Sequence, residues 1–396
     1  MIANDSDYGS DYNSDGEHSL PDEAFAASLA GFDRMTVNRL NVLLALLSPA
    51  QAFAVAAGHE QPRGLVRQLF ALEGLAAAWR QSALRRPPEI VYEQCLSAGV
   101  AVLIRGRDGF PLPLLNDPAP AAVLFVRGDL ARISGRRVGI IGTRNATSSG
   151  RDTATMLGRD LAGLGVHVVS GLARGIDGCA HRGALSVANG AAPLAVVASG
   201  LDVVYPREHA ALWQQVAEQG ALISEGPPGT VPEAYRFPLR NRILAGLSEV
   251  LVVVESRSSG GSLITVNEAR DRGILVMAVP GALRNRASEG TNALLGDGCP
   301  IVLNVDDVLI GLGLDSRRAG GVAYDPRPRP SAADTELLDA LNEPRTLDHL
   351  VLVTGQSLVD CAMGLARLEA DGWVHQVNGW FEAAADSALY GFRSPT

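Results

Sequence analysis

Short apolar runs alternate with amphipathic stretches from about residue 99 to residue 314, and this alternation restricts the fold more than any other feature of the chain. Short apolar runs bounded by Gly, Ser, Glu or Pro are typical of buried strands, and the amphipathic stretches between them indicate helices. Such an order builds successive strand and helix units around a mostly parallel sheet. We therefore predict an α/β domain over residues 99–314, with strands starting near residues 122, 137, 166, 194, 221, 250, 274 and 300.

The segment before this domain divides into two parts. Residues 1–20 are acidic and have too little apolar content to fold, so we expect a disordered tail there. Residues 1–23 hold seven acids and no arginine, so the net charge of −9 falls to −2 for the rest of the chain. Residues 21–98 are rich in Ala and Leu at helical spacing, which predicts a small helical domain.

The segment after residue 314 predicts a linker and a second folded domain. Residues 315–331 are dense in Gly, Pro and Arg, which indicates the linker. Residues 332–390 contain three helical patterns and a hairpin that turns at Asn378-Gly379, the order of a winged-helix domain. The second and third helices are acidic, which favours a protein partner over duplex DNA for this domain.

Composition and spacing argue against several classes of protein. The four cysteines form no CxxC pair, so we expect free thiols, no metal site and no cofactor. The longest apolar segment, from residue 37 to residue 58, is interrupted by Arg39, Asn41 and Pro49, and the N-terminus lacks the pattern of a secretion signal. These features predict no membrane span and a cytoplasmic location. All 34 basic residues are arginine, which reflects genome composition more readily than binding chemistry.

The segment YRFPLRNRILAGLS, residues 235–248, concentrates positive charge without any acid. Proline suits the first position of a helix and disfavours helical geometry at the preceding residue, so we predict a helix from Pro238. Arg240, Asn241 and Arg242 would then lie in its first turn. Unpaired N–H groups and the helix dipole already make that end positive, so the arginines would lack balancing charge until an anion binds.

Other predicted strand ends also carry features that suit phosphate. Gly142, Thr143 and Arg144 close one strand just before a helix expected to begin near Ser148, in a window without acids. Arg207 opens a helix after Tyr205-Pro206, and the loop from Ser258 to Ser262 is an amide-rich turn of the kind that accepts anions. The sequence therefore predicts anion binding at the carboxyl edge of the sheet.

The loop that starts at Ser170-Gly171 leaves more than one interpretation open. Asp177 follows at an expected helix start, where a structural cap is the favoured role. His181 is interpreted as a core or loop histidine rather than a catalyst. Arg174 is either a surface charge or a phosphate contact, and the spacing does not separate the two.

An enzyme is the weaker interpretation of the same strand ends. Asp177, Asp202, Glu225 and Glu255 could hold Mg²⁺, but strand-end acids more often cap helices or pair with arginine. The sequence has no Walker loop, full dinucleotide fingerprint or nucleophile elbow.

Several motifs occurring in order closely resemble the DprA/Smf family of bacterial DNA-processing proteins. The resemblance covers about residues 114–309 and rests on GTR, SGLARGID, GLDVVYP, FPLRNRILAGLS, VVVE, SGGSLITVNEA and AVPG with SEGTNALLGDG. It implies an extended Rossmann-like sheet that binds single-stranded DNA, forms a homodimer and helps to load a RecA-type recombinase during natural transformation. It also implies a sterile-alpha-motif-like N-terminal domain and a C-terminal winged-helix domain.

Carried onto matching positions, the resemblance implies a DNA-binding pocket without catalytic residues. Its residues would be Gly142, Thr143, Arg144, Ser170, Gly171, Arg174, Arg207, Arg240, Asn241, Arg242 and Ser262. Phosphates of a single strand would then supply the charge that the arginines lack. We expect little base stacking, because few aromatic residues lie near these loops, and we expect Phe237 in the core.

Two alternatives remain beside the binding protein. A nucleotide-processing hydrolase of the phosphoribohydrolase type would share the sheet, but its PGGxGTxxE motif corresponds here to SGGSLITVNE, which departs at several positions. A scaffold that recruits partners through the acidic tail and the winged domain is the third hypothesis.

Overall fold

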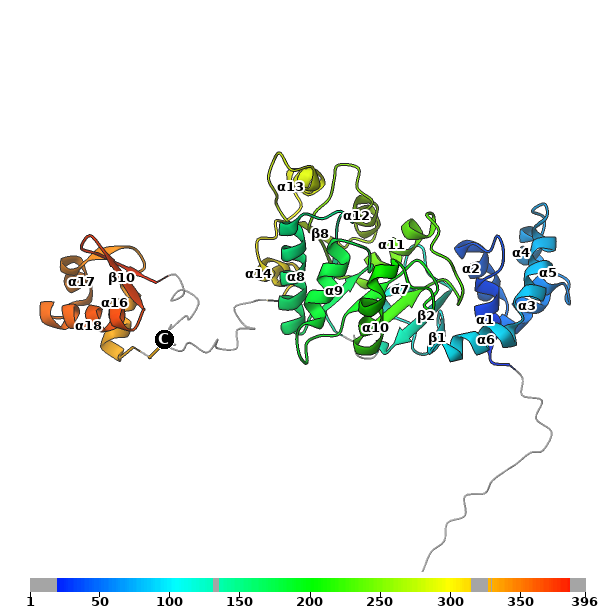
Figure 1. Cartoon of the computed structure of the whole chain (residues 1–396), viewed down its shortest axis with the longest axis horizontal. Helices are drawn as coiled ribbons and strands as arrows, with labels where there is room; N and C mark the ends of the chain where they lie inside the picture. Colours follow the sequence, from blue (N-terminus) through cyan, green and yellow to red (C-terminus); the bar gives the residue numbers. More distant parts are fainter. Residues whose placement is uncertain (1–19, 131–134, 315–326, 329, 385–396) are drawn as a thin grey trace, which may run out of the picture. The chain divides into compact units, whose positions relative to one another are not determined.

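The computed structural model describes residues 20–130, 135–314, 327–328 and 330–384 (Figure 1). The chain divides into two compact units, Met1–Leu314 and Asp315–Thr396, and each is considered by itself. The predicted acidic tail, apart from Leu20, lies outside the described residues. So do most of the predicted linker and the last residues assigned to the winged-helix domain.

The first unit is built on an eight-stranded sheet with the order β1-β2-β6-β5-β4-β3-β7-β8. The strands are β1 (Val100–Ile104), β2 (Val123–Gly128), β3 (Arg137–Ile141), β4 (His167–Ser170), β5 (Leu194–Val196), β6 (Ala221–Ser224), β7 (Val250–Val253) and β8 (Leu275–Ala278). The six strands from β6 to β8 run parallel, and β2 and β1 join antiparallel at one edge. This is a Rossmann-like α/β fold, and the prediction of a mostly parallel sheet is confirmed.

Two strand predictions were wrong, both at the edges of this sheet. Strand β1 was missed because its five residues follow directly on a helix and give too short an alternation. The strand predicted at residue 300 is a single bridge between Ile301 and Ala278. It ends there because the Asp307 carboxylate accepts hydrogen bonds from the N–H groups of Leu303 and Asn304, which turns the chain into a helix.

Helices cover both faces of the sheet (Figure 1). Ala154, Leu157 and Ala180 of α8 and α9 pack on Val138 and Val252, whereas Ile243, Leu244 and Val266 of α11 and α12 pack on the opposite face. The bounds are α7 (Leu112–Leu115), α8 (Ser148–Gly163), α9 (Ile176–Leu185), the 3-10 turn Arg207–His209, α10 (Ala210–Gln219), α11 (Arg236–Leu247), α12 (Ser262–Asp271), the 3-10 turn Arg286–Ser288, α13 (Glu289–Gly296) and α14 (Val305–Gly311).

Six helices precede the sheet and share a core with its antiparallel edge. They are α1 (Asp22–Ala30), α2 (Val37–Leu46), α3 (Pro49–Ala57), α4 (Gly64–Leu69), α5 (Leu75–Arg85) and α6 (Pro88–Ser97). Leu29, Leu43 and Trp79 belong to the same buried cluster as Phe125 of β2 and Trp213 of α10. The N-terminal helices are therefore packed against the sheet by continuous apolar burial.

The second unit has the predicted winged-helix order. It consists of α16 (Ala332–Asp339), β9 (Arg345–Thr346), α17 (Leu347–Thr354), α18 (Leu358–Ala370), β10 (Val374–Val377) and β11 (Trp380–Ala383). The hairpin turns at Asn378 and Gly379, whose φ angles of 52° and 83° are those of the two-residue turn that favours an Asn-Gly pair. Strand β9, which was not predicted, makes the wing a three-stranded sheet.

Among the described helices, none alone has the length and apolar character to cross a membrane, and only two sharply bent pairs pass together. The described residues contain no group of three or more acids, histidines and cysteines that could hold a metal ion. Three of the four cysteines are buried and free, and Cys299 is free and partly exposed.

Helix α11 does not begin where the sequence predicted. It starts at Arg236, two residues before Pro238. Proline is tolerated at the third helical position because the first N–H groups of a helix have no partner inside it. Arg240, Asn241 and Arg242 consequently lie in the second turn, where all three are buried. The prediction that the helix begins at Pro238 and holds these three residues in its first turn was wrong.

Candidate nucleic-acid interface

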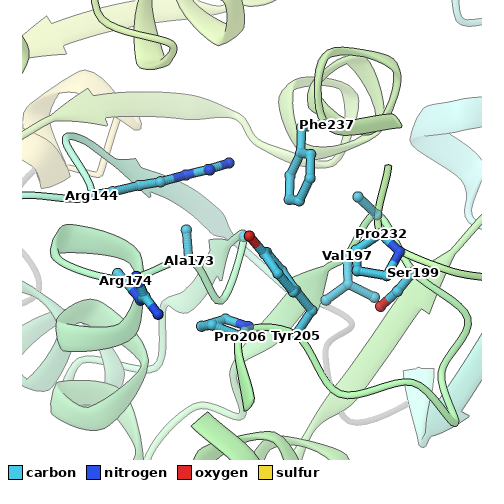
Figure 2. A pocket seen from close by; sticks show the side chains of 11 residues that line it. Arg144, Ala173, Arg174, Val197, Ser199, Tyr205, Pro206, Pro232 and Phe237 are labelled. Carbon is cyan, nitrogen blue, oxygen red and sulfur yellow. The ribbon is translucent and has the colours of Figure 1, made fainter. Parts of the chain in front are cut away.

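Two neighbouring cavities open at the carboxyl ends of the parallel strands. The first is small and apolar, about 60 Å³, and is lined by Arg144, Gly171, Ala173, Arg174, Val197, Ala198, Ser199, Tyr205, Pro206, Pro232 and Phe237 (Figure 2). The second has about 560 Å³ and lies between the loops that follow β3 and β7. Arg144, Ala173 and Phe237 line both cavities. Ligands of parallel α/β sheets bind at this edge of the sheet, which makes the two cavities the candidate site.

Arg144 is the exposed cation that the two cavities share. The loop that carries it is fixed because the Thr143 N–H donates a 2.8 Å hydrogen bond to the Glu255 carbonyl. A Cβ atom on Gly142 would lie 2.5 Å from Ile176 and 2.8 Å from the Glu255 carbonyl, so this close approach requires glycine. In the described part of the chain Arg144 has no carboxylate partner, so its charge is available to a ligand.

The Arg144 guanidinium lies over an aromatic pair. It sits 4.7 Å from the centre of the Phe237 ring, and the Phe237 and Tyr205 rings are 5.5 Å apart at an interplanar angle of 57°. Figure 2 shows the Arg144 side chain extending toward Phe237, with the Tyr205 ring nearby. Phe237 is partly exposed and lines both cavities, so its predicted place in the core was wrong. The two rings offer faces on which nucleic-acid bases can stack.

Arg240 is a structural clamp beneath the cavities. Its side chain is 8% exposed and donates hydrogen bonds to the carbonyl groups of Gly171 and Val196, at the ends of β4 and β5. A Cβ atom on Gly171 would lie 2.2 Å from the guanidinium, so glycine makes room for this clamp. Burial lowers the pKa of Arg240 to about 10, so it remains charged at neutral pH.

Asp177 balances the charge of Arg240 from the start of α9. Its carboxylate lies 4.0 Å from the Arg240 guanidinium, and both side chains are buried. Burial raises the pKa of Asp177, while Arg240 and the backbone N–H groups of Ala173 and Gly171 act in the opposite direction. Asp177 is the second residue of α9 and caps nothing, because Gly175 holds the cap position. The predicted capping role was wrong.

Three further predicted residues have side chains that are already bonded to other groups of the protein, two of them buried and Arg174 at the surface. Arg242 bonds to the Glu225 carboxylate and to the Ala119 carbonyl, outside both cavity linings. Arg174 lines the first cavity but pairs with Glu208, one of its bonds measuring 2.8 Å. Ser170 is fully buried and donates to the Ile140 carbonyl.

Arg207 and Ser262 occupy two different ends of the region. Arg207 follows Pro206, is exposed and has no ion-pair partner among the residues that the structure describes. Ser262 opens α12, lines the second cavity and donates to the Ser256 hydroxyl at 2.8 Å. The structure thus brings Gly142, Thr143, Arg144, Gly171, Arg174, Arg240, Asn241 and Ser262 into the two cavity linings, and leaves Ser170, Arg207 and Arg242 outside them.

Sequence reasoning missed Arg257 and undervalued Tyr205 and Phe237. Arg257 is exposed, lines the second cavity and is two residues beyond Glu255 after β7. The sequence did place Arg257 after a predicted strand, with no acid between it and Glu268, and this pattern could have identified it as a free cation. The aromatic pair gave less signal, because Tyr205 and Phe237 are far apart in sequence.

His181 lies behind the clamp, fully buried in α9. Burial is the main cause that lowers its pKa from 6.5 to about 3. Neither ring nitrogen completes a hydrogen bond with the described residues. The histidine is therefore neutral in the folded protein, as expected for a core position.

This burial predicts a pH-dependent stability. Because the folded pKa lies below the unfolded one, the contribution of His181 is fully present above about pH 6.5 and is lost as the pH falls toward 3. Between pH 7.5 and pH 5 the free energy of unfolding should fall by about 2 kcal/mol from this group alone. In urea titrations a His181→Leu variant should lose this part of the pH dependence, whereas His59→Leu, at an exposed histidine, should keep it. Equal pH dependence in His181→Leu and the unchanged protein would contradict this account.

Comparisons with known proteins identify relatives of the chain. The family described as DNA recombination-mediator protein A matches residues 101–313. The chain is 40% identical over 200 residues to DNA processing protein DprA of Bacillus subtilis, covering 50% of this chain and 67% of that protein. It is 35% identical over 279 residues to Protein Smf of Escherichia coli, covering 69% and 74%.

A solved structure supports the same relationship. The X-ray structure of DNA processing protein A from Streptococcus pneumoniae superimposes with a TM-score of 0.60 and 26% identity. The match covers 74% of this chain and 98% of that one. The fold, the ordered motifs and the matched residues lead to one conclusion: the chain belongs to the family of DNA recombination-mediator protein A.

Proposed function

We propose that the protein binds single-stranded DNA, without catalysis, at the carboxyl edge of its parallel sheet. One observation carries the proposal: Arg144 is exposed, has no carboxylate partner among the described residues, and lies 4.7 Å from the ring of Phe237. A free cation beside accessible aromatic faces suits a strand with a phosphate backbone and unstacked bases. Arg207 adds a second free cation beyond Tyr205 and Pro206.

The aromatic pair favours a single strand over a duplex. Tyr205 is 40% exposed and lies against Phe237, so its ring can receive a base only when that base has left its own stack. Bases in a duplex are already stacked on their neighbours and would have to be unpaired first. Stacking is also tolerant of sequence, since every base has a ring face. The expectation of limited stacking is thus replaced by a proposal in which stacking contributes.

The wider role is a further step of the same proposal. We infer that the protein protects incoming DNA and loads a RecA-type recombinase during natural transformation and recombination, as a homodimer in the cytoplasm. The matched family description, DNA recombination-mediator protein A, supports the mediator role. Ile301 and Leu303 are exposed apolar residues beside the β8 edge of the sheet, which supports association of two copies there.

Binding assays with single-stranded and duplex oligonucleotides test the core of this proposal. The affinity for a single strand should exceed that for a duplex of the same length by about tenfold or more, the effect of stacking one base. Two phosphate contacts, at Arg144 and Arg207, predict that affinity falls at least about sevenfold between 50 and 200 mM salt. Equal affinity for both forms, or affinity that does not change with salt, would overturn it.

A further inference from the structure

The second cavity occupies the point where the sheet reverses its winding. From β3 the chain continues to β4 on one side, whereas β7 lies on the other side of β3. Loops after β3 and β7 therefore diverge and leave a crevice between them, the usual ligand position in open parallel sheets. Thr143, Asn241 and Ser262 line this cavity, whose volume of about 560 Å³ accommodates a small ligand.

The charges around the cavity do not cancel. Arg144, Arg240 and Arg257 line it, whereas Asp177 is the one acid in its lining. Asp177 is already set against Arg240 at 4.0 Å. Arg144 and Arg257 are exposed and have no ion-pair partner in the described ranges, which leaves two positive charges for a ligand.

Hydrogen-bond donors also face this space without partners. Asn241 is 9% exposed, and its Oδ1 atom accepts a 3.1 Å hydrogen bond from Arg240 Nε, which fixes the orientation of the amide. Its Nδ2 atom donates to no group in the described structure, although Asn241 lines the cavity. This amide nitrogen is accessible from the cavity, so it can donate a hydrogen bond to an acceptor bound there.

Helix α12 adds donors from the opposite wall. This ten-residue helix begins at Ser262, and Gly261 at its cap position supplies no side-chain acceptor. The N–H groups of Gly261 and Ser262 have no hydrogen-bond partner within the residues described. Together with the helix dipole they favour an anion.

We propose that this cavity binds the phosphate monoester of a nucleotide, either a free nucleoside 5′-phosphate or the 5′-phosphorylated end of a DNA strand. A monoester carries about −1.5 to −2 charges at neutral pH, which matches two free arginines better than the single charge of a backbone diester. The second source rests on the proposed single-strand binding, because the two cavities share Arg144 and Phe237 and a strand could pass from one to the other.

Paired ligands that differ only in the monoester test this site in the full chain. We compare 5′-phosphorylated and 5′-hydroxyl oligothymidylate of one length by fluorescence anisotropy, and thymidine 5′-phosphate and thymidine by calorimetry. The ratio of affinities within each pair is the readout. If the ratio is about ten or more in the oligonucleotide pair, the ligand of the cavity is the 5′-phosphorylated strand end. If it is about ten or more in the mononucleotide pair, the ligand is the free nucleotide.

Two variants connect the ratio to the cavity. Asn241→Asp keeps the oxygen that accepts from Arg240 but replaces the unpartnered Nδ2 donor by a second oxygen. Arg257→Gln removes an exposed positive charge from the cavity. Each variant should bring the ratio of affinities close to one. Arg67→Gln, at an exposed arginine of α4, should leave it unchanged. Thermal melting checks folding, and the exposed Arg257 site keeps the test valid if Asn241→Asp unfolds.

The outcomes separate this inference from the proposed function. A ratio near one in both pairs for the unchanged protein, or a ratio that survives both variants, overturns the phosphate site. Binding of the 5′-hydroxyl oligonucleotide reports on the single-strand proposal independently of that ratio.

Discussion

Replacing Arg144 and Arg207 together by alanine is expected to lower the affinity for a single-stranded oligonucleotide about 100-fold while the protein stays folded. Both side chains are exposed and neither has an ion-pair partner in the described structure, so their loss costs binding and little stability. A hydrogen bond to a charged group is worth about 1.5–3 kcal/mol, and two such contacts account for a 100-fold change. Fluorescence anisotropy with a labelled oligothymidylate measures the change.

The salt dependence of the same variant gives a second readout. Each lost phosphate contact should reduce the slope of log affinity against log salt by about 0.7, so the double variant should lose about 1.4. Arg63→Ala with Arg67→Ala, at two exposed arginines next to and within α4, removes equal charge elsewhere. If this control weakens binding as much as the Arg144 and Arg207 variant does, the loss reflects overall charge and not the proposed site.

Arg240→Ala should act on the fold first and lower the free energy of unfolding by about 3–5 kcal/mol. The substitution removes the donor to the Gly171 and Val196 carbonyl groups and leaves the buried Asp177 carboxylate without its cation. Breaking one side of a buried pair costs more than the pair contributes, because the remaining charge stays buried. Urea titration of the large unit, followed by tryptophan fluorescence, measures the loss.

A double-mutant cycle separates the charge from the hydrogen bonds. In an Asp177→Asn background the cost of Arg240→Ala should be smaller by at least about 1 kcal/mol, because no carboxylate is left uncompensated. A cost below about 1 kcal/mol for Arg240→Ala alone would show that the clamp does not hold the ends of β4 and β5. It would also restore Arg240 as a candidate DNA contact.

The sheet could be predicted from the sequence because its strands are short apolar runs bounded by Gly, Ser, Glu or Pro. The strands from β2 to β8 appear close to their expected positions, and Thr147 caps α8 at the expected start. The edges were harder. Strand β1 and the bridge at Ile301 depend on pairing with partners, which local periodicity does not reveal.

The arginines of α11 show why a local window misleads about charge. No acid lies between residues 234 and 248, yet Asp177 at the start of α9 balances Arg240, and Glu225 directly after β6 balances Arg242. Both acids were predicted as possible arginine partners, but the sequence alone does not assign the pairs. Parallel strands bring distant segments to one edge, so charge balance there is a property of the fold.

The aromatic pair was underestimated for the same reason. Tyr205 ends one loop and Phe237 lies in the first turn of α11, and only the folded sheet places their rings 5.5 Å apart. Arg144 arrives from a third segment. The GTR motif correctly indicated a cation at the strand end. The aromatic surface beside this cation could be recognised only in the folded structure.

Photochemical cross-linking of a single strand tests the position of the proposed interface most directly. An oligothymidylate containing 5-iodouracil is irradiated with the full protein, and the modified residues are mapped by mass spectrometry. The account predicts adducts on Tyr205 or Phe237 that an unlabelled single strand displaces more readily than a duplex. Adducts confined to residues 330–384, with none near Tyr205 or Phe237, would contradict it.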